Sequence, residues 1–107
     1  MTGTEGAIDT GSVLRRRGDV RFRLVEDEAV VVRQSAAEVL VLNEVASRIL
    51  ALADGSGPVG TWVEALLGEY AVEREVLTRD VLAFAVELTA AGLLEPAPPA
   101  AGDDLGV

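Results

Sequence analysis

The side chains that could do chemistry in this sequence are carboxylates, hydroxyls and guanidinium groups. The chain contains no Cys and no His, and all of its basic residues are Arg. It therefore has no thiol nucleophile, no imidazole base and no lysine for a Schiff base. Ser47 has no base to activate it, and nothing near the run Glu26–Glu28 would give its carboxyl groups separate acid and base roles. We expect a binding protein without catalytic residues, metal ligands or cofactors.

The charges restrict the choice of partners. Asp and Glu total 18 against 9 basic residues, which gives a net charge of −9. Nucleic acids and anionic membrane surfaces are therefore disfavoured as partners, because both require a basic face. Arginines are nevertheless concentrated within residues 15–33. This cluster could contact an acidic peptide or a partner enzyme, although solvated arginines on a strand face are the more common case.

Length and composition indicate one small domain. The 107 residues are 50% hydrophobic and can close one modest core. No apolar stretch is long enough to span a membrane, and we expect a cytoplasmic protein without a secretory signal. Residues 1–12 are predicted to form a disordered tail, residues 13–95 the folded domain, and residues 96–107 a disordered Pro/Ala/acidic tail.

Three strands are predicted in the first half of the chain. Apolar and cationic residues alternate over residues 20–24, which is the period of a half-buried strand with Phe22 and Leu24 facing inward. The β-branched run at residues 29–33 would close a hairpin with it. Residues 38–42 form a third, wholly apolar strand after Glu38.

Three helices follow these strands. Asn43 stands where an N-cap residue is needed, and the helical spacing after it stops at Asp54-Gly55. Pro58 marks the start of a second helix, and a third covers about residues 73–91. The predicted class is α+β, with a three-stranded antiparallel sheet followed by three helices in the order β-β-β-α-α-α.

The third strand is unusual because it is apolar on both faces. Leu40 and Leu42 can serve the core, which leaves Val39 and Val41 on the opposite face. Glu38 is its only charge and it contains no proline, so another chain could pair with it if it lies at a sheet edge. The alternative is that both faces are buried, by a tail or by a dimer partner.

The third helix carries more apolar residues than one core-facing stripe requires. Leu82 and Val86 are four residues apart and share a face outside that stripe. A helix that is apolar on more than one face is either deeply buried or has a second partner. A groove between this face and the third strand would accept alternate side chains of a bound strand.

The middle of the chain resembles PqqD-like proteins. The series Leu42-Asn43-Glu44-Val45-Ala46, Ile49-Leu50 and Asp54-Gly55 is similar to the "LN-x-x-A…IL…DG" core of that family, and the likeness extends over about residues 20–94. Pro58 stands where a polar residue is usual, and residues 33–38 lack the Pro-Glu and Gly signature expected for pyrroloquinoline quinone synthesis. We therefore expect a relative that serves another modified peptide.

The resemblance implies a winged-helix-like RiPP recognition element, a non-catalytic domain that binds the leader of a ribosomally made precursor peptide. In that family the leader adds as a strand antiparallel to the third strand and packs against the third helix. The domain presents the precursor to a tailoring enzyme, such as a radical-SAM enzyme, or to a leader protease. Carried onto this chain, the peptide-binding residues would be Glu38, Val39, Leu40, Val41, Leu42, Arg79, Leu82, Ala83 and Val86.

Two other functions fit part of the pattern. The helical order also permits a winged-helix DNA-binding regulator, but the second helix offers no basic residue and the third offers only Arg74 and Arg79. A structural homodimer would pair the third strand with its own copy. In that case dimerisation and peptide binding would compete for one edge.

Overall fold

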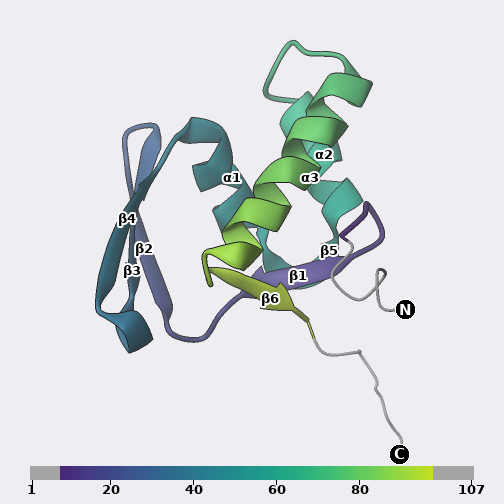
Figure 1. The fold of residues 1–107 in the computed structure, drawn as a ribbon. Helices are drawn as coiled ribbons and strands as arrows, with labels where there is room; N and C mark the ends of the chain where they lie inside the picture. Colours follow the sequence, from purple (N-terminus) through teal and green to yellow (C-terminus); the bar gives the residue numbers. More distant parts are fainter. Residues whose placement is uncertain (1–7, 98–107) are drawn as a thin grey trace, which may run out of the picture.

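The computed structural model describes residues 8–97, which form an α+β fold of two small antiparallel sheets and three α-helices (Figure 1). The predicted class and the three predicted helices are confirmed. One sheet stands at the side of the molecule, like the wing of a winged-helix protein, and the helices pack beside it. No helix within residues 8–97 is long and apolar enough to cross a membrane.

The sheet at the side, which we call the wing, contains the three predicted strands. These are β2 (Val20–Val25), β3 (Glu28–Arg33) and β4 (Glu38–Leu42), with β3 in the centre. A two-residue turn joins β2 to β3, and its first residue, Glu26, has a φ of 58°. Such a turn matches the twist of the flanking strands and therefore fixes the register of the hairpin.

The second sheet was not predicted. Its strands are β1 (Val13–Arg16), β5 (Asp54–Pro58) and β6 (Leu94–Pro96), with β1 in the centre. The sequence predicts Asp54-Gly55 only as a helix stop, and the Gly, Ser and Pro residues of this segment are poor strand formers. The pairing partners on β1 override this propensity, since they satisfy the backbone groups of both flanking strands.

Residues just outside the predicted domain, 13–95, also pack against it. Ile8 packs against the core, and the N–H of Gly60 donates to the carbonyl of Thr10 at 2.9 Å. At the other end the N–H of Ala97 donates to the carbonyl of Val13 at 2.9 Å. The rest of the two predicted tails, residues 1–7 and 98–107, lies outside the described residues.

The helices are α1 (Glu44–Leu52), α2 (Val59–Leu67) and α3 (Arg74–Ala90). Helix α1 packs against β3 and β4, while α2 and α3 pack against each other and over the second sheet. Leu77, Val81, Ala85 and Leu88 of α3 are buried, as the predicted core stripe requires. One hydrophobic core joins the three helices to both sheets; its largest fully buried side chains are Ile49, Leu50, Leu66, Leu93, Leu94, Val31, Val59 and Val81.

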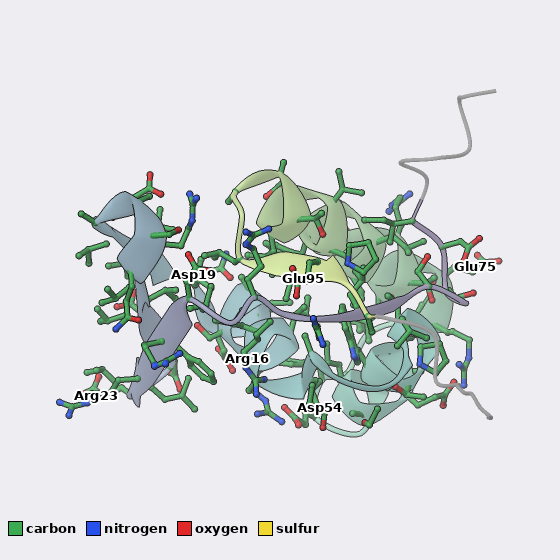
Figure 2. All side chains as sticks on the ribbon, turned by 90° about the horizontal axis from the view of Figure 1, so that it is seen from below. Arg16, Asp19, Arg23, Asp54, Glu75 and Glu95 are labelled. Atoms are coloured by element: carbon green, nitrogen blue, oxygen red, sulfur yellow. The ribbon has the colours of Figure 1, made fainter. Side chains whose placement is uncertain are left out.

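Arg16 connects the wing to the rest of the fold. Its Nη1 donates to the carbonyls of Leu50 and Ala51, at 2.9 and 3.1 Å, at the C-terminal end of α1. Its guanidinium carbon also lies 5.3 Å from the ring centroid of Phe22 in β2. A cation favours both positions, because helix C-termini and aromatic faces carry partial negative charge. Figure 2 shows Arg16 between the wing and the second sheet.

Asn43 caps α1 as predicted, and its removal should destabilise the fold. The Asn43 Oδ1 accepts a hydrogen bond from the N–H of Ala46 at 2.9 Å. We expect Asn43→Ala to lower the free energy of unfolding by about 1 kcal/mol, because that N–H loses its partner. Asn43→Ser keeps an acceptor and should stay close to the native protein. Urea denaturation measures both variants, and equal stability of the two would contradict the capping role.

Candidate functional site

Strand β4 forms an open edge of the wing. It pairs with β3 from Arg33↔Glu38 to Ala29↔Leu42, and no strand within residues 8–97 pairs with its other side. The predicted orientation is confirmed, because Leu40 and Leu42 are half-buried whereas Val39 and Val41 are 64% and 63% exposed. The exposed valines of β4 are therefore covered neither by the helices nor by the described ends of the chain.

The hairpin register determines which backbone groups face the open edge. In a two-residue hairpin the closing pair, here Val25 and Glu28, exchanges hydrogen bonds, and bonded pairs then alternate along the ladder. Residues 28, 30 and 32 therefore bond to β2, and the intervening residues of β3 bond to β4. It follows that Val39 and Val41 each direct one N–H and one C=O away from the sheet. An added strand would find these donors and acceptors at the usual spacing.

The beginning of β4 is held against the C-terminal end of α3. The Arg33 Nη1 lies 3.0 Å from the Glu38 Oε1 and 3.3 Å from the Ala91 carbonyl oxygen. The guanidinium group lies directly against the backbone of Gly92, which has a φ of +82°. This contact links β3, β4 and α3 at one point.

The short 3-10 helix Gln34–Ala36, which precedes β4, is also held in place. The Ser35 hydroxyl donates to the carboxylate of Asp19. This hydrogen bond lowers the pKa of Asp19 below its usual value. Ala37 then adopts a left-handed conformation, with a φ of 51°, which turns the chain into β4.

The end of β4 is fixed by α1. The Ser47 hydroxyl lies 3.1 Å from the carbonyl oxygen of Leu42 and 2.6 Å from that of Asn43. The Tyr70 hydroxyl holds the first turn of α1 by donating a hydrogen bond to Glu44 at 2.7 Å. This carboxylate raises the pKa of Tyr70 to about 12. Both ends of β4 are therefore anchored, while the edge between them stays open.

Two of the hollows along helix α3 contain predicted site residues. One contains a half-buried aromatic ring and two carboxylates; it is lined by Asp80, Ala83, Phe84 and Glu87. The other is almost entirely apolar in surface despite its charged rim; it is lined by Arg74, Glu75, Thr78, Arg79 and Leu82.

The hollow around Phe84 lies on the side of α3 that faces the wing. Phe84, Glu87 and Ala91 follow one another at three- and four-residue spacing, so they share one side of the helix. The row ends at the Ala91 carbonyl, which accepts a hydrogen bond from Arg33 of the wing. A strand added to β4 would therefore direct its inward side chains toward this hollow.

The predicted helix residues divide between the two hollows. Ala83 lies in the hollow around Phe84, whereas Arg79 and Leu82 line the other one. Val86 is 49% exposed and shares the row of Arg79 and Leu82. That row begins at Glu75, which Figure 2 shows on the opposite side of the molecule from Arg23 of the wing.

Sequence reasoning missed Asp80, Phe84 and Glu87 as candidate site residues. Phe84 stands at the core spacing of the third helix, and the structure packs it, partly buried, against the core. The useful signal was the spacing of residues 80, 84 and 87, which places an aromatic ring between two carboxylates on one side of α3.

Comparisons with known proteins agree with this geometry. Residues 28–94 match the PqqD family, described as coenzyme PQQ synthesis protein D. The PqqA binding protein of Gluconobacter oxydans (strain 621H) is 32% identical over 94 residues, which cover 88% of this chain and 98% of that protein. Residues 28–94, which match the family, include β3 and β4 of the wing and all three helices.

Solved structures show the same fold. TbiB1 in complex with the TbiA(beta) leader peptide is 28% identical, with a TM-score of 0.69 over 76% of this chain and 94% of that one. Lasso peptide synthetase B1 complexed with the leader peptide is 24% identical, with a TM-score of 0.69 over 79% of this chain and 100% of that one. The PqqD truncation of Methylobacterium extorquens PqqCD, a stand-alone RiPP recognition element, is 23% identical, with a TM-score of 0.70 over 86% of this chain and 98% of that one.

The fold places the chain among small winged-helix-like α+β modules. Within that class, the chain belongs to the PqqD family.

Proposed function

We propose that this protein binds the leader of a ribosomally made precursor peptide as an additional strand on β4, without catalysing a reaction. The observation that carries the proposal is the open edge of β4, with its outward N–H and C=O groups at Val39 and Val41. The TbiB1 and lasso peptide synthetase B1 structures, which hold leader peptides on this fold, support the same function.

The leader would lie antiparallel to β4, and its side chains would alternate between two environments. Residues opposite Val39 and Val41 would point to the outer face of the wing. The residue between them, opposite Leu40, would point inward toward α3, where Ala83 and Phe84 offer an apolar surface. Main-chain hydrogen bonds would then provide affinity, and this inward residue would provide selectivity.

The assignment of Glu38–Leu42 and Ala83 as leader contacts forms the core of this proposal. Arg79, Leu82 and Val86 stay predictions on the other side of α3, and a leader that continues around the helix would reach them. The PqqA binding protein supports a precursor peptide as the ligand. We also propose that this chain serves a peptide other than the pyrroloquinoline quinone precursor. It would pass this peptide to a radical-SAM enzyme or a leader protease in the cytoplasm.

A titration followed by nuclear magnetic resonance tests the proposal. The ligand is a synthetic peptide with the sequence of a candidate precursor's leader. We expect the backbone amides of Val39 and Val41 to shift most and to become protected from hydrogen exchange, because they gain carbonyl partners. The amides of Phe22 and Leu24, which face the opposite edge of the wing, serve as the internal control. Shifts confined to that edge, or no shifts at all, would contradict the proposal.

A further inference from the structure

The outer face of the wing carries the side chains that point away from the helices. The register places Arg21, Val32 and Val39 in one row across the three strands. It places Arg23, Val30 and Val41 in the next row. Each row therefore runs from an arginine at the β2 edge to an exposed valine at the β4 edge.

This outer face is more apolar than an ordinary solvated sheet face. Val25, Val32, Val39 and Val41 are each more than a third exposed. The part nearest β2 is hollowed, and its lining includes Val25, Val30 and Val32. Clustered apolar side chains with a charged border are typical of protein interaction surfaces.

The charged groups on the outer face are mainly basic. Arg23 forms no hydrogen bond or ion pair with any side chain or backbone group of residues 8–97, and Figure 2 shows it at the far end of the wing. Among the described residues, Arg21 donates only to the backbone carbonyls of Gly18 and Val20. The two rows contain no carboxylate; the nearest ones along the hairpin are at its tip, in Glu28, opposite Val25, and in the turn residues Glu26 and Asp27. The centre of the face therefore presents two guanidinium groups without carboxylate partners beside a strip of valines.

We propose that the outer face of the wing is the docking surface for the enzyme that modifies or cleaves the precursor, and that this enzyme presents an apolar patch bordered by carboxylates. The inference rests on the proposed leader binding. The two arginines select carboxylates, and the valines require apolar contact. A second copy of this chain fits less well, because it would bring another net charge of −9 to the contact.

The leader would form part of the same surface. Leader residues opposite Val39 and Val41 project to the outer face, so a bound leader extends the valine strip by one strand. A docked enzyme would then contact the leader and the wing together. The coupling is reciprocal, so the leader should raise the affinity for the enzyme and the enzyme should raise the affinity for the leader.

The test uses the purified enzyme, a tailoring enzyme or a leader protease, that processes the candidate precursor. We expect the double variant Arg21→Gln/Arg23→Gln to bind that enzyme roughly tenfold more weakly, and to bind the synthetic leader within about twofold of the native protein. Arg15→Gln/Arg17→Gln removes the same charge near the second sheet and is the matched control. Both affinities are measured by calorimetry, the enzyme with and without leader. Equal enzyme affinity of the two double variants would overturn the proposal.

Crosslinking provides a second readout. The chain has no cysteine, so Val32→Cys carries a single photoreactive label on the outer face, and Val72→Cys carries one in the exposed segment between α2 and α3. We expect the label at position 32 alone to crosslink to the enzyme. Crosslinks only to a second copy of this chain would overturn the inference in favour of a dimer. A leader that fails to bind would contradict the proposed function instead, and the enzyme measurements without leader would still decide the docking surface.

Discussion

Val41→Pro should reduce the affinity for the leader at least about tenfold while leaving the fold intact. The Val41 N–H points to the open edge, so proline removes a donor to the leader and places its ring where the leader backbone would lie. An unsatisfied carbonyl in the complex costs about 1–3 kcal/mol, and 1.4 kcal/mol corresponds to a tenfold change in affinity. The hydrogen bonds between β3 and β4 involve neighbouring residues and should persist. Calorimetric titration with the synthetic leader measures the loss.

Two variants control this experiment. Leu24→Pro makes the same change at the opposite edge of the wing, where the N–H also faces outward. Val41→Thr keeps the β-branched shape and the N–H at position 41. Both should bind the leader within about threefold of the native protein, a difference of about 0.7 kcal/mol. An equal loss for Leu24→Pro and Val41→Pro would show that the open edge of β4 is not the binding site.

Gly92→Ala should lower the free energy of unfolding by about 1–3 kcal/mol. Gly92 has a φ of +82°, a conformation that costs an L-residue with a Cβ about 1–2 kcal/mol. A Cβ there would also lie 2.9 Å from the Cζ of Arg33, which must then move. Because Arg33 holds Glu38 at the start of β4, we expect the leader to bind several times more weakly as well. Thermal and urea denaturation measure the stability of the variant.

Gly18→Ala is the matched control for Gly92→Ala. An added Cβ at Gly18 meets nothing within 4 Å, and its backbone is not left-handed. It should be neutral or slightly stabilising, because alanine restricts the unfolded chain. Gly92→Asn separates the two causes at position 92, since asparagine tolerates the left-handed region better than alanine does. If Gly92→Ala proved as stable as Gly18→Ala, neither the strain nor the contact with Arg33 would matter.

The regular elements could be predicted from local pattern. The alternation at residues 20–24 and the β-branched run at residues 29–33 gave β2 and β3, and Asn43 gave the start of α1. The sequence also indicated that Val39 and Val41 face away from the core, but it left open whether their strand is an edge strand or is buried on both faces; the sheet order, with β4 paired only to β3 within residues 8–97, shows the open edge. The strands β2 and β3 and the start of α1 depend on near neighbours in sequence, which is why the sequence alone could predict them.

The second sheet and the wing-facing side of α3 could not be predicted from local sequence patterns. The pairing of β1 with β5 and β6 joins residues far apart in sequence, and the Asp54–Pro58 segment has no strand propensity of its own. Similarly, Phe84 stands at core spacing, and the hollow beside it is lined by residues of α3 alone, so its relation to β4 depends on where the wing lies. The contact of Arg33 with Ala91 fixes that position, and no periodicity in either segment indicates it.

The anchored ends of β4 have a consequence for the evolution of its ligands. The groups exposed between those ends are peptide N–H and C=O groups, which every amino acid except proline can match. Mutations in a precursor that keep the leader extended would therefore leave most of the attachment unchanged, apart from the few side chains that enter the hollow on α3. A host could diversify its peptide products while retaining one carrier.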